Sequence, residues 1–338
     1  MLKNYFNQKG VHLSAKIYFI DAMGAMAYGL FATLLVGTIL KTIGQEFNVP
    51  FLTQTVWPLA AQATGPVLAL AIAYSLKAPQ LVLFSSAIVG VASYDLGGPL
   101  GVFIATIIAV EIGKLCSNLT KLDIIITPVL TVLVGVALAE FTGPTVQSIM
   151  QGLGNLVTAS TNTNPFIMGV LVAVIVGMVL TLPISSAALC LMLDLKGLAA
   201  GAATVGCCAQ MIGFAVLSFK ANKWKGLVAI GLGTSMLQMP NIYKNWRIWI
   251  PPTLAAAVLG PLATQVFFME NTALESGMGT CGLVGQIGTY NAMKSTVGMS
   301  GLVIKILSLH FILPAVLSYL FYLILEKLNW IKASDFKL

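Results

Sequence analysis

An all-α, polytopic membrane protein is the fold class that this sequence predicts. Of its 338 residues, 58% are hydrophobic and only 9% are charged, and its mean hydropathy is +0.92. A soluble domain carries about a quarter charged residues. About 20 apolar residues in a row cross a bilayer as a helix, because a helix satisfies its own backbone polar groups. Composition therefore excludes a soluble globule, and the apolar runs predict about ten transmembrane helices.

Each expected helix is an apolar run bounded by charged, glycine-rich or proline-containing residues. In chain order the runs cover 17–43, 56–76, 81–94, 98–115, 124–141, 166–193, 198–219, 227–239, 251–269 and 302–325. Runs 81–94 and 227–239 are short for a full crossing, and 269–301 is rich in Gly, Asn, Thr and Ser. We expect discontinuous or re-entrant helices there, which are tolerated where they are buried in protein or face a water-filled cavity.

The second half of the chain resembles a diverged copy of the first. Three short motifs recur in the same order in both halves, namely Ala61-Gln62-x-x-Gly65 with Ala209-Gln210-x-x-Gly213, Gly98-Pro99-Leu100 with Gly260-Pro261-Leu262, and Glu111-x-Gly113 with Glu275-x-Gly277. Five spans per half would invert the second copy relative to the first, which is the usual arrangement of a transporter. We expect a cytoplasmic segment 1–16, repeats 17–141 and 166–325, a linker 142–165 with a solvent loop at 159–164, and a cytoplasmic tail 326–338.

Lysines predict the orientation. Residues 1–16 and 326–338 each carry three lysines, which places both termini in the cytoplasm of a multi-pass protein of the bacterial inner membrane. Lys220, Lys223 and Lys225 conflict with this count, because they fall on the opposite side. The net charge of +7 is explained by cytoplasmic anchors, so lipid is the expected partner and nucleic acid is not.

Carboxylates among apolar residues are the first functional candidates, because burying a charge in a membrane is costly. Glu270, Asn271 and Glu275 lie in a glycine-rich stretch, and two acids five positions apart do not share a helix face. An unwound segment is expected there, offering polar groups to a solute; the alternative is a solvated loop. Glu111 is the matched acid of the first half, and its alternative role is to pair with Lys114.

Other polar residues within apolar runs complete the set of candidates. Gln62 and Gln210 suit a hydroxyl-bearing solute, and their alternative role is a hydrogen bond between helices. Asp21, Asp95 and His310 are candidates for proton coupling. For Asp95 the alternative is to cap the helix that begins after Gly98, and for His310 it is a satisfied structural role.

No sequence signature indicates an enzyme, a cofactor or a metal. The five cysteines lack metal-ligand spacing, and the chain has no phosphate-binding glycine loop, zinc-protease motif, nucleophile elbow or dinucleotide fingerprint. A membrane enzyme is therefore a weak alternative. Transport of a small polar solute is the expected function.

The layout resembles the EIIC-type permeases of the bacterial sugar phosphotransferase system, in particular the stand-alone branch with perfringolysin-regulator-like membrane proteins. The residues that support the resemblance are Gly10-Val11-His12-Leu13-Ser14, the stretch 18–27, and the glutamate-containing, glycine-rich segment after Phe268. The resemblance implies that Glu270 or Glu275 contacts a sugar, although the Gly-Ile-Thr-Glu form of the family motif is missing. It also implies a homodimer and separate phosphotransferase components as partners.

These observations predict a permease that moves a carbohydrate or related hydroxylated metabolite by alternating access. The solute would contact Glu270, Asn271, Glu275, Gln62, Gln210 and Glu111. The alternative is a membrane sensor or regulator that binds a solute without moving it. Short internal loops favour the permease, because a sensor needs a cytoplasmic signalling surface.

Overall fold

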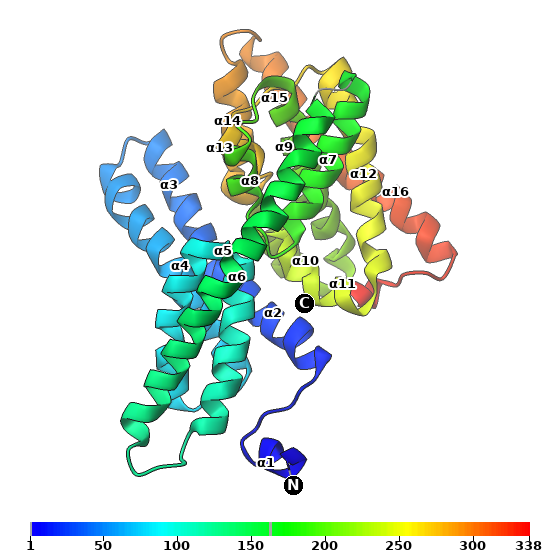
Figure 1. The fold of residues 1–338 in the computed structure, drawn as a ribbon. Coiled ribbons are helices and arrows are strands. Elements are labelled where there is room, and N and C mark those ends of the chain that lie inside the picture. The colour runs from blue at the N-terminus through cyan, green and yellow to red at the C-terminus, as the bar shows by residue number, and fades with distance from the viewer. Residues whose placement is uncertain (1, 162–163) are drawn as a thin grey trace. The chain divides into compact units, whose positions relative to one another are not determined.

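The described part of the chain is predominantly helical. A computed structural model describes residues 2–161 and 164–338, of which 84% are helical, and no β-strand occurs in these ranges (Figure 1). The expected all-α class is confirmed. The chain forms two compact units, unit 1 (Met1–Ile149) and unit 2 (Met150–Leu338). The finer boundaries at 17, 142, 166 and 326 stay a prediction.

Four long helical stretches begin in unit 1, and the last of them, α6, continues into unit 2. The first alternates α-helical and π-helical turns, and the third and fourth are the longest helices of the chain. The elements are α1 (Leu2–Gln8), η1 (Ile17–Ala22), α2 (Met23–Leu30), η2 (Phe31–Leu35), α3 (Val36–Glu46), η3 (Phe51–Val56), α4 (Trp57–Ser75), α5 (Gln80–Cys116) and α6 (Asp123–Thr161).

Helix α5 is a hairpin of two helical arms. Gly98 interrupts it with φ 55° and ψ −152°. A Cβ atom at Gly113 would lie 2.9 Å from Val82, although 31 residues of straight helix would separate these positions by about 46 Å. The arms therefore run antiparallel, and they correspond to the predicted runs 81–94 and 98–115.

The reversal at Gly98 predicts a measurable cost for any side chain there. Its backbone angles lie in a region that only glycine adopts readily, and nothing approaches within 4 Å of a Cβ at this site. Gly98→Ala should therefore destabilise the protein by about 1–3 kcal/mol through the backbone alone, measured by thermal unfolding in detergent. Gly152→Ala, an equally open but helical position in α6, should be neutral or slightly stabilising. Equal melting temperatures for the two variants would contradict this account.

Helix α6 is longer than the sequence predicted. It continues past residue 141 to Thr161, so the expected end of the helix at 141 is wrong. Residues 159–161, which were expected to belong to a solvent loop at 159–164, are helical as well. Residues 162–163 lie outside the described ranges. Its 39 residues would extend about 58 Å. Packing explains the continuity, because Gly135 and Gly143 let α6 approach Val89 and Leu96 on α5 closely. Pro128 and Pro144 are accommodated within this helix.

Unit 2 is built from shorter and more broken helices. Its elements are α7 (Pro165–Thr181), α8 (Ser186–Met192), α9 (Gly197–Leu217), α10 (Phe219–Val228), η4 (Ala229–Gly233), η5 (Ser235–Gln238), α11 (Met239–Lys244), η6 (Trp246–Trp249), α12 (Ile250–Pro261), η7 (Leu262–Val266), α13 (Ala273–Ser276), η8 (Cys281–Leu283), α14 (Val284–Met293), α15 (Met299–Leu307), η9 (Ser308–Ile312), α16 (Leu313–Lys327) and η10 (Ala333–Phe336).

The predicted run 166–193 is not one span. It breaks after Thr181, where Leu182 is extended at ψ 160° before Pro183, and α8 begins only at Ser186. A residue before proline is disfavoured in helical geometry, which explains the break. The sequence analysis missed it because hydrophobicity continues through the turn.

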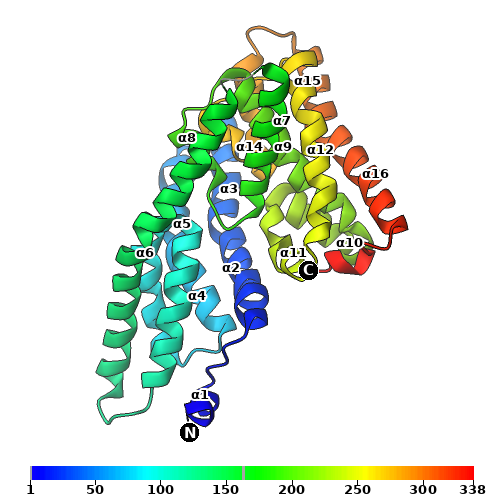
Figure 2. The ribbon, with the colours of Figure 1, turned by 45° about the vertical axis from the view of Figure 1, so that its right-hand side comes forward.

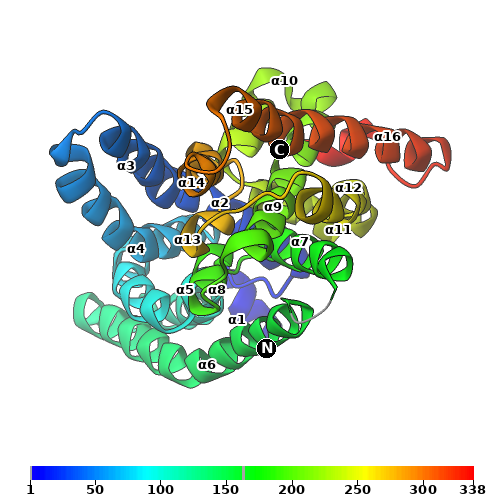
Figure 3. The same ribbon diagram turned by 90° about the horizontal axis from the view of Figure 1, so that it is seen from above.

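Helix α9 is the centre of unit 2, surrounded by α7, α12, α13 and α14 in Figure 3. Glycines allow backbone-to-backbone contact around it. A Cβ at Gly206 would lie 2.0 Å from the carbonyl oxygen of Ala173 on α7, and one at Gly201 would lie 1.9 Å from that of Met269. Real Cβ contacts are longer than 3 Å. Only glycine therefore permits this packing.

Within the described ranges, six helical stretches are long and apolar enough to cross a membrane. They are Ile17–Glu46, Phe51–Ser75, Gln80–Cys116, Asp123–Thr161, Gly197–Leu217 and Met299–Lys327, with Pro165–Thr181 as a shorter apolar helix. The expected count of about ten is not confirmed. The two copies of the Gly-Pro-Leu motif also differ in local structure, since Gly98 reverses the chain while Gly260 lies within α12. The inverted repeat stays a prediction.

Candidate functional site

Two hairpin segments of unit 2 lie beside α9 and form the candidate site (Figure 2). The first, residues 182–196, contains α8. The second, residues 267–293, contains α13, η8 and α14. We call them the first and second hairpin.

Contacts with α9 show that the second hairpin enters and returns at the same end of that helix. An isolated antiparallel bridge pairs Asn271 with Gly197, where α9 begins. Farther along, Thr280 bonds to Met211 Sδ at 3.5 Å, and the returning chain brings Gly285 back beside Thr204. The segment thus has the geometry expected for the glycine-rich stretch 269–301, a discontinuous hairpin rather than a lipid-facing helix.

The two hairpins touch at Ser186 and Gly277. The Ser186 hydroxyl donates a hydrogen bond to the Gly277 carbonyl at 2.7 Å. A Cβ at Gly277 would lie 2.6 Å from the Ser186 backbone, so the absence of a side chain permits the contact. This serine, at the start of α8, was not among the predicted residues.

Asn271 holds the second hairpin together. Its side chain is 3% exposed, and Nδ2 donates to Thr204 Oγ1 at 2.7 Å and to the Gly285 carbonyl at 3.0 Å. Its Oδ1 accepts the Thr272 N–H at 2.8 Å. The amide therefore links the incoming extended segment, the returning helix α14 and α9. Thr204 is a second residue that the sequence analysis missed.

Glu275 lies next to Asn271 on the second hairpin. A Cβ at Gly288 would lie 2.4 Å from Glu275 Cβ and 2.5 Å from Asn271 Oδ1, so both side chains face the same glycine of α14. Glu275 is partly buried, and its Oε2 is buried without a hydrogen-bond partner among the described residues. Such an oxygen is expected to have a partner, because unsatisfied buried polar atoms are rare.

Glu270 occupies a different environment from Glu275. It is exposed at the protein surface, and its backbone N–H contacts Met293 Sδ at 3.3 Å. Extended Thr272, with φ −100° and ψ 167°, separates it from α13. The expected irregular backbone between the two acids is therefore present.

Gln210 serves as a hydrogen-bonding hub between helices. It is fully buried on α9, accepts from Trp249 Nε1 at 3.0 Å and from the Thr181 hydroxyl at 3.4 Å, and donates to Thr253 at 3.1 Å. It lies six residues beyond Thr204 along α9, about 9 Å. These contacts fit the alternative structural role.

His310 and Gln286 form a buried pair in unit 2. The Nε2 of Gln286 lies 3.2 Å from His310 Nδ1 and 3.4 Å from Cys208 Sγ. His310 Nε2 and Gln286 Oε1 have no partner among the described residues. The sequence does carry a signal for Gln286, because this glutamine lies between Gly285 and Gly288 in an apolar context, much as Gln62 and Gln210 each lie three residues before a glycine.

The candidates of unit 1 do not gather into a comparable site. Glu111 pairs with Lys114 at 3.1 Å and accepts the Tyr18 hydroxyl at 3.1 Å, in line with its alternative structural role. Gln62, Asp21 and Asp95 are exposed at the protein surface. The helix arm after Gly98 has no side-chain cap from Asp95 among the hydrogen bonds of the described chain, so the expected cap is not seen.

The six apolar helical stretches of membrane length in the described chain indicate a multi-pass membrane protein, and the two hairpins of unit 2 carry its buried polar groups. A model of the family described as Phosphotransferase system, EIIC matches residues 20–338, so the chain belongs to that family. EIIC proteins are the membrane components of sugar phosphotransferase systems. Neither the comparison with curated proteins nor that with solved structures found a match.

Proposed function

We propose that this EIIC protein is a permease for a polyhydroxylated solute, a sugar or polyol, which binds where the two hairpins of unit 2 meet. The buried Oε2 of Glu275, without a partner beside the hydrogen-bonded amide of Asn271, is the observation that supports the proposal most directly. A hydroxyl group that donates to this oxygen would satisfy it.

The polar groups of the site match the chemistry of a sugar. A carboxylate accepts from two neighbouring hydroxyls, and free backbone carbonyls and amides of an unwound segment add further donors and acceptors. Glu270, exposed beside Met293, would meet the solute first and Glu275 would hold it. Gln210 and Glu111 stabilise their units through the bonds described above.

Alternating access would follow from relative movement of the hairpins. The first and second hairpin are joined by the hydrogen bond from the Ser186 hydroxyl to the Gly277 carbonyl. Because Gly277 has no side chain, no interlocked side chain at this position opposes their separation. Separation there would open the site toward one side of the membrane. We assign phosphoryl transfer to separate phosphotransferase components, and we propose a homodimer in the bacterial inner membrane with cytoplasmic termini.

A ligand screen tests the proposal. The purified protein in detergent is heated in the presence of sugars, polyols and organic acids, and we expect one sugar or polyol to raise its melting temperature. A ligand at 100 times its Kd stabilises the folded state by about 2.7 kcal/mol. Deoxy analogues of the stabilising compound serve as controls and should lose the effect. Stabilisation by organic acids alone, or equal stabilisation by the deoxy analogues, would contradict a hydroxyl-reading site.

A further inference from the structure

One end of unit 2 concentrates the basic residues of the chain. Of the 18 lysines and arginines in the whole chain, eight lie in three separate segments, 219–226, 241–249 and 327–338. We call them the basic collar: Lys220, Lys223, Lys225, Lys244, Arg247, Lys327, Lys332 and Lys337.

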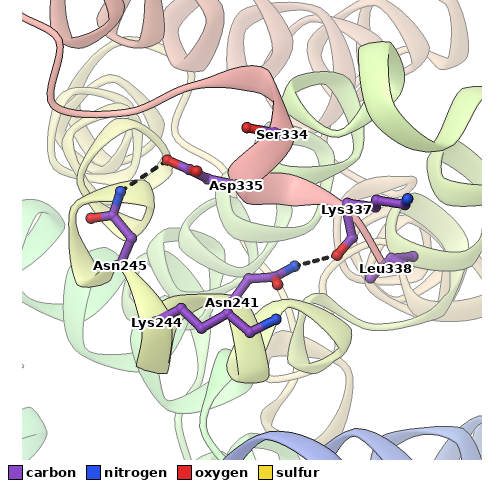
Figure 4. A pocket seen from close by; sticks show the side chains of 7 residues that line it. All are labelled: Asn241, Lys244, Asn245, Ser334, Asp335, Lys337 and Leu338. Carbon is purple, nitrogen blue, oxygen red and sulfur yellow. Dashed lines mark hydrogen bonds between the residues drawn. The ribbon is translucent and has the colours of Figure 1, made fainter.

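Hydrogen bonds show that the three segments form one surface. Asn222 donates to the Phe336 carbonyl at 2.7 Å, joining the first segment to the third. Asn241 donates to the Lys337 carbonyl and Asn245 to Asp335 Oδ2, each at 2.9 Å, joining the second to the third (Figure 4). Phe336 is fully buried, which fixes the third segment against the unit.

The collar lies at the ends of apolar helices. Helices α9 and α16 finish at Leu217 and Lys327, and α12 starts at Ile250, directly beside the three segments. These helices pack against one another. In a membrane, the collar therefore lies where the hydrocarbon ends and the lipid headgroups begin.

Exposed tryptophans indicate the same position at the membrane interface, independently of the charges. Trp224, Trp246 and Trp330 are 69%, 65% and 43% exposed, and all three lie in the collar segments. Exposed tryptophans are enriched at the membrane interface, where one side of the ring is apolar and the other is hydrated. Arg247 stacks 5.0 Å from the Trp330 ring centroid, so charge and aromatic surface are combined.

The positive charge of the collar is not neutralised within the described chain. The acidic side chains at the collar already have partners, since Asp335 accepts from Asn245 and from the Lys332 N–H, and Glu326, directly before the third segment, accepts the Tyr322 hydroxyl. No collar cation belongs to an ion pair among the described residues. A cavity of about 390 Å³ opens between α11 and η10 (Figure 4). Its charged lining residues are Lys244, Lys337 and the hydrogen-bonded Asp335, and the amides of Asn241 and Asn245 also face it.

We propose that the basic collar binds the headgroups of anionic phospholipids and thereby fixes this end of unit 2 at the cytoplasmic leaflet. Clusters of four to eight lysines and arginines next to a membrane helix attract such lipids. The exposed tryptophans favour a lipid headgroup over a soluble anion as the ligand. Tryptophan is enriched where a protein meets the membrane interface, and binding of free phosphate would not account for these exposed rings.

The proposal also resolves the orientation conflict at Lys220, Lys223 and Lys225. The sequence analysis counted 166–193 as a full crossing, but Pro183 breaks it and α8 leads back to the start of α9. One crossing fewer moves these three lysines to the side that holds the C-terminal segment, which the bond from Asn222 to Phe336 requires.

The test compares two triple variants of the full chain. Lys220→Gln/Lys223→Gln/Lys225→Gln removes collar charge, and Lys77→Gln/Lys121→Gln/Lys294→Gln removes the same charge from exposed sites elsewhere. Short-chain phosphatidylglycerol or phosphatidylcholine is titrated into each detergent-solubilised protein, and binding is measured by native mass spectrometry. We expect wild type to prefer phosphatidylglycerol, and the collar variant to bind it about 100-fold more weakly, at about fivefold per cation.

Three results would overturn the proposal. They are equal binding of the two lipids by wild type, equal losses in the two triple variants, and displacement of phosphatidylglycerol by inorganic phosphate at the same concentration. The last result would indicate a free-anion site. Melting temperatures show whether each variant is folded, and a single Lys225→Gln variant, expected to lose about fivefold, replaces the triple variant if that variant is unstable.

Discussion

Replacing Glu275 by glutamine should lower solute uptake into reconstituted vesicles by about tenfold to a hundredfold. A hydrogen bond to a charged group contributes about 1.5–3 kcal/mol, and the variant loses the charge at the oxygen proposed to receive the solute. The same change should leave the melting temperature equal or higher, because the buried Oε2 has no partner in the described chain and a neutral amide is cheaper to bury.

Opposite effects on uptake and stability distinguish a binding role from a structural one. Glu140→Gln removes an exposed carboxylate on α6 and serves as the matched control, with uptake unchanged. If Glu275→Gln keeps full uptake, Glu275 does not contact the solute. If its melting temperature falls steeply, the carboxylate stabilises the fold instead.

Local signals in the sequence were enough to predict the helical arms and the irregular site segment. Gly98 followed by Pro99 predicted the break between two short runs, and the structure has its reversal at Gly98. Clustered glycines after Phe268 predicted a discontinuous segment, because glycine permits close approach and unusual backbone angles. The second hairpin follows that expectation, with Gly279 and Gly282 at positive φ.

Tertiary contacts decided what the sequence could not predict. The residues that complete the site contact partners far away in the chain, 91 residues from Ser186 to Gly277 and 67 from Thr204 to Asn271. No local pattern encodes such pairs. Hydrophobicity continues through Pro183, where the chain breaks, and weakens around Pro144, where α6 stays helical because it is packed against α5.

Membrane crossings are counted wrongly when a hairpin is read as a span. On the proposed topology, the error at α8 inverts the expected side of the residues up to the run 227–239, which is not a crossing either, since Asn222 before it and Asn241 after it bond to the same C-terminal segment. Two errors cancel, so Lys220 seemed misplaced while the C-terminal lysines did not. Loop charges therefore carry information about broken helices, because an apparent violation of the positive-inside bias indicates a segment that turns back.

Gly201→Ala should have the largest structural effect of any single methyl group at the site. The added Cβ would lie 1.9 Å from the carbonyl oxygen and 2.5 Å from the carbonyl carbon of Met269, and neither backbone atom can rotate away. The second hairpin would have to move away from α9 by about 1 Å. Overpacking of this kind destabilises a protein by about 1–3 kcal/mol or more.

That displacement should also abolish uptake, because Asn271, two residues after Met269, bonds to Thr204 on the same face of α9 at 2.7 Å. Gly298→Ala is the matched control, since nothing lies within 4 Å of a Cβ there and its φ of −59° suits alanine. Melting temperature in detergent and vesicle uptake are measured for both variants. An unchanged melting temperature for Gly201→Ala would mean that the second hairpin does not pack against α9 at this glycine. Normal uptake with a lowered melting temperature would mean that the contact between Gly201 and Met269 stabilises the fold but does not position the solute site.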